Sequence, residues 1–282
     1  MVNNWRPGYA FIAPGIIMLT LLLGFPAVMS LMQSFNIGAS EPVSANAYIK
    51  LASDPEFWST MRNTAIFVVS VVSMHFILGL GVALLLNMDI PGRWVFRVLA
   101  ILPWTMPDVI GGLIFRFIFD TLGGGVNAVI QWAGAAPIDW LGHPQLSLLA
   151  VIFAETWRGY PYVMLILLAG LQSIPRDQYE AAEVDGVGRF KVFLHITLPN
   201  LKQMIVIALV LDTIWECRLF GMIYGMTGGG PGYATQNLSL LVYKNYFQFF
   251  DVAYASSIAV VLAAILLVLA VPYVRMTLKQ ER

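Results

Sequence analysis

The chain has 282 residues, of which 59% are hydrophobic and only 11% are charged, and its formal net charge is zero. A soluble globular domain is usually about 45–50% apolar and about 25% charged, so this composition indicates a membrane protein. The neutral balance argues against nucleic acid as a partner, because no basic excess is available to neutralise phosphates.

Six apolar runs are long enough to cross about 30 Å of hydrocarbon, which predicts an all-α polytopic membrane protein with about six transmembrane helices. They are residues 9–35, 63–87, 96–119, 146–171, 201–226 and 252–274. The first run lacks a small-residue cleavage site, so we expect a retained helix rather than a signal peptide. The whole chain, 1–282, is therefore predicted to form a single transmembrane domain.

Lysine and arginine residues are distributed unevenly over the connections between these runs. The connections on the side of the two termini, counted with the first two residues of the runs that follow them, carry ten of them, the opposite connections carry three, and three more lie deeper inside the runs. Basic residues accumulate on the cytoplasmic side of membrane proteins. Both termini and the polar segment 174–200 are therefore predicted to be cytoplasmic.

The fourth and fifth runs contain charged and aromatic residues at membrane depth, where a charge is costly unless it is paired or faces a polar cavity. Glu155 and Tyr162 share one helical face with Gly159, and Trp215 shares another with two acidic residues, Asp212 and Glu216. Carboxylates accept hydrogen bonds from sugar hydroxyls, and aromatic rings stack on the apolar face of a sugar. The pattern therefore favours sugar binding.

A structural role is the alternative for the charged residues, which would then pair among themselves and hold the helices together. The residues concerned are Glu155, Arg158, Asp212, Glu216, Arg218 and Arg116. A third hypothesis has Arg158 or Arg218 bind an anionic substituent of the substrate, for which a guanidinium is suited. The three histidines lack metal-ligand spacing with cysteines or carboxylates, so we expect no metal site, and His75 is expected to be a hydrogen-bonded packing residue.

The segment 174–200 has a local pattern of its own. Pro175 can begin a short helix, and Gly186 and Gly188 allow the chain to reverse before a second helical stretch that leads to Pro199. Such an element can dock in a partner's groove, with Glu180 and Asp185 available to pair with basic groups there.

Seven residues of this segment follow the spacing E-A-A-x3-G-x9-I-x-L-P, which resembles the cytoplasmic coupling loop of permease subunits in ATP-driven importers. They are Glu180, Ala181, Ala182, Gly186, Ile196, Leu198 and Pro199. The runs of sequence R-N-T at 62–64, L-P-W at 102–104 and W-R-G-Y-P-Y at 157–162 are similar to carbohydrate-importer permeases. The loop T-G-G-G-P-G at 227–232 resembles the larger permease of the maltose type.

The resemblance implies the permease fold of a type I ATP-binding-cassette (ABC) importer in the cytoplasmic membrane of a bacterium or archaeon. It implies four kinds of partner besides the lipid bilayer: a second homologous permease, an ATPase dimer, an extracytoplasmic binding protein and a sugar substrate. The substrate would be a di- or oligosaccharide or a sugar derivative, moved by alternating access. ATP and Mg would be bound by the ATPases, because Gly228–Gly230 is not followed by the Gly-Lys-Ser/Thr of a phosphate-binding loop. No cofactor and no catalytic residue is expected in this chain.

The resemblance also assigns roles to individual residues. A substrate cavity would be lined by Trp104, Glu155, Arg158, Gly159, Tyr162, Trp215, Glu216 and Leu219. Asp212 and Arg218 are added to this set because they are charged residues at membrane depth. ATPase coupling would involve Glu180, Ala181, Ala182, Asp185, Gly186 and Pro199.

Two other function classes were weighed. A proton-coupled secondary sugar transporter would use Glu155, Asp212 or Glu216 and would have no need of a coupling loop. A membrane-embedded enzyme would need a nucleophile or a metal constellation that the sequence does not show.

Overall fold

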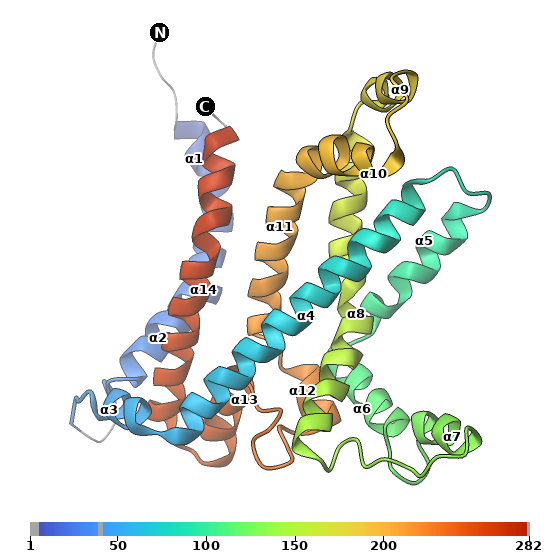
Figure 1. Ribbon diagram of the computed structural model, residues 1–282. Helices are drawn as coiled ribbons and strands as arrows, with labels where there is room; N and C mark the ends of the chain where they lie inside the picture. The colour runs from blue at the N-terminus through green and yellow to red at the C-terminus, as the bar shows by residue number, and fades with distance from the viewer. Residues whose placement is uncertain (1–5, 39–41, 281–282) are drawn as a thin grey trace. The chain divides into compact units, whose positions relative to one another are not determined.

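The computed structural model describes residues 6–38 and 42–280, and within these ranges the chain is helical and contains no strand (Figure 1). The all-α prediction is confirmed. The chain divides into two compact units, one from the N-terminus to Phe57 together with Leu241–Ala264, and the other from Trp58 to Leu240 together with Ile265 onward. The expectation of a single domain over 1–282 stays a prediction.

The first unit is built around the N-terminal helix and the start of the last one. It contains α1 (Arg6–Leu19), the π-helical turn Thr20–Gly24, α2 (Phe25–Gln33), α3 (Asn46–Ser53), the π-helical turn Lys244–Gln248 and the first half of α14 (Val252–Gln280). Lys50 donates to Asp251 at 2.7 Å, and the hydroxyl of Tyr254 donates to Asp54. These contacts fix the short helix α3 against the beginning of α14.

The second unit carries the remaining elements. They are α4 (Pro55–Asn87) from Trp58 onward, α5 (Arg93–Ile101), the 3-10 turn Leu102–Thr105, α6 (Asp108–Ile118), α7 (Gly125–Trp132), α8 (Pro144–Ser173), α9 (Arg176–Val184), α10 (Arg189–Val192), the π-helical turn Phe193–Thr197, α11 (Leu198–Cys217), α12 (Gly221–Met226), α13 (Leu238–Tyr243) as far as Leu240, and α14 from Ile265 onward. Within this unit, α9 and α10 lie at the end opposite to α6, α7 and α12 (Figure 1).

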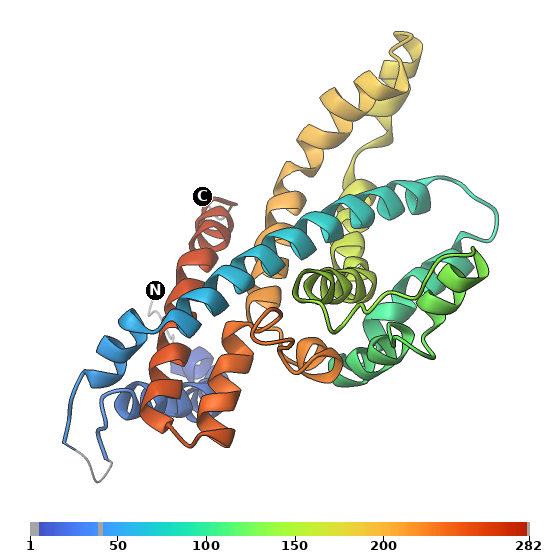
Figure 2. The same cartoon turned by 60° about the horizontal axis from the view of Figure 1, so that its bottom comes forward.

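The core of the second unit lies among α4, α8 and α11. In both views α4 runs obliquely across the other two helices (Figures 1 and 2). Fully buried side chains from all three meet there, among them Ala83, Met164, Leu167 and Leu201. The same three helices position the polar cluster described below.

Four helical stretches in the described residues are long and apolar enough to cross a membrane: Phe11–Gln33, Pro55–Asn87, Arg189–Cys217 and Val252–Arg275. A fifth is counted if Arg93–Thr105 and Asp108–Ile118 form one broken span. The predicted fourth span corresponds to α8, which is 30 residues long but has the polar sequence W-R-G-Y-P-Y at its middle. The prediction of about six spans is therefore approximate.

Two of the predicted spans are not continuous helices. The third bends by 95° between Thr105 and Asp108, where Pro107 forces the preceding Met106 into an extended conformation. The fifth ends at Cys217, and α12 begins at Gly221. The short helix α12 then packs on α6 through glycines, since a Cβ on Gly112 would lie 2.6 Å from the carbonyl oxygen of Met222.

Candidate functional site

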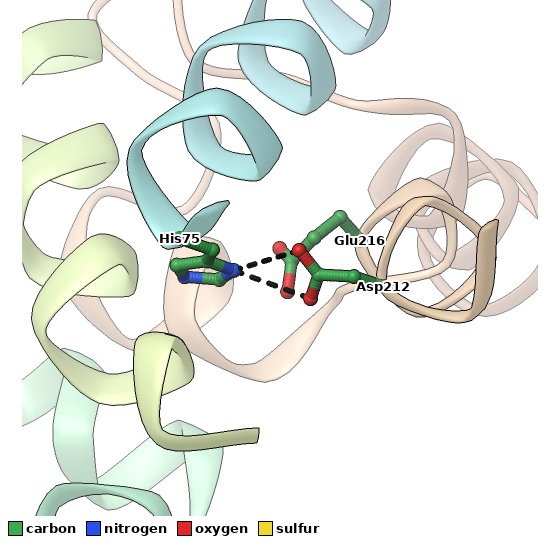
Figure 3. A group of neighbouring side chains, drawn as sticks. All are labelled: His75, Asp212 and Glu216. Carbon is green, nitrogen blue, oxygen red and sulfur yellow. Dashed lines mark hydrogen bonds and ion pairs between the residues drawn. The ribbon is translucent and has the colours of Figure 1, made fainter. Parts of the chain in front are cut away.

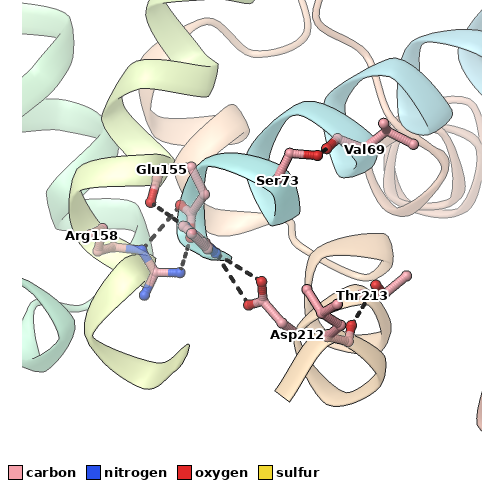
Figure 4. Close-up of polar contacts among 8 residues, drawn as sticks. Val69, Ser73, Glu155, Arg158, Asp212 and Thr213 are labelled. Atoms are coloured by element: carbon pink, nitrogen blue, oxygen red, sulfur yellow. Dashed lines mark hydrogen bonds and ion pairs between the residues drawn. The ribbon is translucent and has the colours of Figure 1, made fainter. Parts of the chain in front are cut away.

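Five ionisable side chains are buried together where α4, α8 and α11 cross. His75, Glu155, Arg158, Asp212 and Glu216 are each at most 3% exposed. Figure 4 labels Glu155, Arg158 and Asp212 and marks their contacts with dashed lines. Because burying such groups is costly unless they are paired, their partners determine what the cluster can do.

His75 links all three helices, and Figure 3 shows its contact with Asp212 of α11. Its Nδ1 lies 3.0 Å and 3.2 Å from the two carboxylate oxygens of Asp212, and its Nε2 lies 3.1 Å from the backbone oxygen of Glu155. A carbonyl oxygen only accepts, so Nε2 must carry a proton. A second proton is then required between Nδ1 and Asp212, on the ring or on the carboxyl group. The prediction of a hydrogen-bonded packing histidine is confirmed.

Arg158 is held by two carboxylates. Its Nη2 and Nε donate to Glu155 one turn earlier in α8, at 2.5 Å and 3.1 Å, and its Nη1 lies 2.9 Å from Asp108 at the start of α6. This bidentate arrangement is a strong form of charge-assisted pairing. Arg158 therefore connects α8 to α6, and Glu155 lies beneath it as its partner.

Gly159 lets His75 reach its partners. A Cβ at position 159 would collide with the imidazole ring, so only glycine allows α4 and α8 to approach this closely. The residue was predicted to line a substrate cavity. It also has a packing role that the sequence pattern does not reveal.

Glu216 is the least satisfied member of the cluster. Its Oε2 is buried and has no hydrogen-bond partner. His75, Asp212 and Glu216 each offer a potential metal-ligand atom within 4.8 Å of the others (Figure 3). Both ring nitrogens of His75 are already hydrogen-bonded, so the geometry is that of a proton-sharing network, and the expectation of no metal site stays a prediction.

A small hollow adjoins the cluster and is lined by seven of the ten residues predicted to contact substrate. They are Trp104, Arg158, Gly159, Tyr162, Asp212, Trp215 and Glu216. Its volume of about 10 Å³ is enough for about one water molecule. Three of the lining rings form a row, with Tyr162 6.0 Å from Trp104 and 6.3 Å from Trp215 between centroids.

The segment 174–200 forms a second candidate site at the far end of the unit. Pro175 directly precedes α9, and the chain reverses at Gly186, whose φ of +69° favours glycine, before α10 begins. Gly188 has an ordinary φ of −64°, so its predicted part in the reversal is wrong. Ala182 is buried, whereas Glu180, Ala181, Asp185, Gly186 and Pro199 are exposed. The surface of α9 is therefore available to a partner.

Comparison with known proteins decides the class of the molecule. Residues 75–278 match the family described as binding-protein-dependent transport system inner membrane component. The chain belongs to this family. It is a transport permease subunit and not an enzyme, and the alternative of a proton-coupled secondary transporter is not supported.

The curated relatives of the permease include sugar transport proteins. The trehalose/maltose transport system permease protein MalF of Thermococcus litoralis is 36% identical over 273 residues, which cover 95% of this chain and 92% of the relative. The sulfoquinovosyl glycerol transport system permease protein SmoG of Agrobacterium fabrum is 36% identical over 270 residues, covering 94% and 88%. The lactose transport system permease protein LacF of Rhizobium radiobacter is 33% identical over 277 residues, covering 95% and 91%.

The fold of the permease is also found in solved importers. A bacterial ABC transporter involved in the import of the acidic polysaccharide alginate matches with a TM-score of 0.86 at 21% identity, over 99% of this chain and 97% of the other. The alginate transporter in complex with a pentasaccharide-bound periplasmic protein matches with a TM-score of 0.82 at 22% identity, over 96% and 93%. The predicted ABC importer permease fold is confirmed.

Three residues predicted to contact substrate do not line the hollow of the permease. Glu155 is occupied by Arg158. Leu219 is 3% exposed, and its backbone oxygen accepts from Asn237 at 2.5 Å. Arg218 is exposed, with its guanidinium carbon 5.1 Å from the ring of Trp215. Arg218 thus lies beside a lining ring without lining the hollow itself.

The glycine-rich loop of the permease is fixed by polar contacts that sequence reasoning did not anticipate. Gly228, Gly229 and Gly232 have φ between +59° and +92°. The Asn63 amide donates to the backbone oxygen of Tyr233 at 2.7 Å, and the Thr64 hydroxyl accepts from the backbone N–H of Leu238 at 3.1 Å. Asn63 and Thr64 could have indicated these contacts from the sequence, because polar residues at the start of an apolar run need hydrogen-bond partners.

Proposed function

We propose that this permease translocates a sugar or sugar derivative delivered by an extracytoplasmic binding protein, together with a second permease and two ATPase subunits that bind ATP and Mg. The single observation that carries the proposal is the juxtaposition of a row of three aromatic rings with buried carboxylates at one hollow. Rings stack on the apolar faces of sugars, and carboxylates accept from their hydroxyl groups.

The substrate would contact the residues that line the hollow. Trp104, Tyr162 and Trp215 would stack on sugar rings, and the orphan carboxylate oxygen of Glu216 would accept a sugar hydroxyl. Asp212 already shares its charge with His75, and Arg158 is held by Glu155 and Asp108. We therefore assign recognition chiefly to the three rings and Glu216, and positioning of the helices to the other charged groups.

A hollow of about 10 Å³ cannot hold a sugar, so binding requires the walls to separate. Two breaks in the helices flank this hollow. Trp104 lies just before the bend at Met106 to Pro107, and Trp215 lies just before the break after Cys217. Rigid segments on either side of such breaks can reorient about them. Alternating access would open and close the hollow at these two positions.

Coupling to ATP hydrolysis would pass through α9 and the reversal after it. Glu180, Ala181 and Asp185 are exposed and would contact the ATPase, while the hydroxyls of Tyr179 and Thr197 lie 3.2 Å apart and fix α9 to the following segment. In this arrangement α9, α10 and both termini face the cytoplasm of a bacterial or archaeal cell. A displacement of α9 would be transmitted to α11 through that contact.

Of the two arginines suggested for an anionic substituent on the sugar, Arg218 is the better placed. Arg158 already donates to two carboxylates, so binding an anion there would break the contact to Asp108. Arg218 is exposed beside Trp215 and forms no ion pair among the described residues. Arg218→Gln should therefore weaken uptake of an anionic sugar and leave uptake of its neutral analogue unchanged.

The test is ATP-dependent uptake into proteoliposomes by the complete complex, with candidate sugar-loaded binding proteins. Trp215→Ala should raise the half-saturating concentration of loaded binding protein or abolish uptake, because a stacked ring contributes about 1–3 kcal/mol by analogy with aromatic stacking on planar ligands. Phe117→Ala, an exposed aromatic on α6 that does not line the hollow, is the matched control. Equal uptake by both variants for every sugar tested would refute the assignment of the hollow.

A further inference from the structure

A second cavity, separate from the hollow, lies where the connection of α4 to α5 meets the connection of α8 to α9. Its volume is about 550 Å³, which exceeds that of a single ordered water many times over. It is lined mostly by polar and basic side chains: Asn87, Asp89, Arg93, Arg97, Leu171, Gln172, Arg176 and Tyr179. The residues assigned to sugar binding do not line it, while two of its residues, Arg176 and Tyr179, belong to the segment 174–200.

The lining carries more positive than negative charge. Arg93 pairs with Asp89 at 3.1 Å, which leaves the guanidinium groups of Arg97 and Arg176 without an ion pair among the residues that the structure covers. Arg97 makes one long contact, 3.5 Å from its Nη2 to the backbone oxygen of Leu86, and its Nε is buried without any partner. A buried N–H of a cation without an acceptor is costly, so the geometry calls for an anion.

The backbone adds positive potential at the same place. The helix α5 begins at Arg93 and α9 begins at Arg176, and both residues line the cavity. Neither helix has a side-chain cap at its N-terminus. The cavity is therefore surrounded by two helix N-termini without side-chain caps and by the guanidinium groups of Arg97 and Arg176.

We propose that this cavity binds a phosphate group. Guanidinium groups match the oxygens of phosphate in bidentate geometry, which suits Arg97 and Arg176. The next residue after Arg93 is Trp94, which is 70% exposed, and the following turn of α5 exposes Phe96 and Leu99. An exposed tryptophan followed by apolar surface is typical of the membrane interface, so an anionic phospholipid headgroup fits the site as well as a soluble phosphate compound does.

The experiment uses the purified full-length chain in a neutral detergent, mixed with equimolar phosphatidylglycerol and phosphatidylcholine, and counts retained lipids by native mass spectrometry. The wild type should retain phosphatidylglycerol in preference to phosphatidylcholine. Arg97→Gln and Arg176→Gln should each weaken that retention by about tenfold, since each removes a charge-assisted contact. Arg189→Gln removes an equal charge from an exposed position that does not line the cavity, and should leave retention unchanged.

Excess inorganic phosphate distinguishes a phospholipid headgroup from a soluble phosphate compound as the ligand. Displacement of phosphatidylglycerol by phosphate would assign the cavity to phosphate groups from either source, and retention against excess phosphate would assign it to the lipid. Equal retention by Arg176→Gln, Arg189→Gln and the wild type would overturn the proposal, as would a wild type that binds neither phosphatidylglycerol nor inorganic phosphate. Because Arg176 is exposed, we expect Arg176→Gln to fold. The test therefore stays decisive even if Arg97→Gln fails to fold.

Discussion

The close contact between Gly159 and His75 gives a direct prediction for Gly159→Ala. The added methyl group collides with the imidazole ring, and the ring has no space to retreat because His75 is 0% exposed. Displacing it breaks the contacts to Asp212 and to the backbone oxygen of Glu155. Each buried group left unsatisfied costs about 1–3 kcal/mol, so losing both contacts costs about 2–6 kcal/mol, reduced by the helix preference of alanine, about 0.5–1 kcal/mol.

The assay is unfolding of the purified permease in mixed micelles, without substrate, followed by tryptophan fluorescence. Gly81→Ala in α4 is the matched control, since nothing lies within 4 Å of its added Cβ. The change should also be made in a His75→Ala background, where the methyl group has space, so that most of its cost disappears. A Gly159→Ala variant as stable as Gly81→Ala, or one equally costly in both backgrounds, would refute the reasoning.

Three further outcomes are expected. Gly186→Val places a β-branched side chain at a φ of +69° and should abolish stimulation of the complex's ATPase by loaded binding protein, whereas Gly188→Ala, at a φ of −64°, should preserve it. Asn127→Ala removes five hydrogen bonds to the α6–α8 connection and should lower the free energy of unfolding by about 2–4 kcal/mol, with Gln131→Ala on the same helix as the control. Backbone N–H groups of Gly123 and Leu122 lower the pKa of Asp120, so its stabilising effect should be complete at neutral pH and be lost as the pH falls from the ordinary aspartate pKa, about 3.9, through the lowered value. The Asp120→Asn variant should therefore be less stable than the wild type at neutral pH, and the free energies of unfolding of the two should become equal only at the lowest pH.

Local patterns predicted the features that depend on neighbouring residues in the chain. The apolar runs gave the long helices, and Gly186 marked the reversal after α9 because its backbone conformation favours glycine. A break near Pro107 is also readable, since a proline restricts the residue before it, but the prediction of one continuous span over 96–119 does not include it.

The contacts of the candidate site could not be predicted in the same way. His75 and Asp212 are 137 residues apart, and Arg158 meets Asp108 on another helix. Periodicity showed that Glu155 and Tyr162 share a face of α8, and the spacing of three residues allowed Glu155 to pair with Arg158, but the pattern could not show that Asp108 would join them. The sequence therefore identified most of the residues around the hollow. It could not show which of them pair with other helices and which stay exposed in its wall.

The pairing of Arg158 with Glu155 and Asp108 separates two kinds of position in the wall of the hollow. Arg158 joins α8 to α6 there, so replacing it carries a cost in folding, whereas Trp104 and Trp215 are 38% and 42% exposed and contribute little to the packed interior. Under the proposed role of the rings, relatives can change their cargo preference by substitutions at these two tryptophans while the ion pairs are kept. A library aimed at a new cargo would accordingly vary the two tryptophans first.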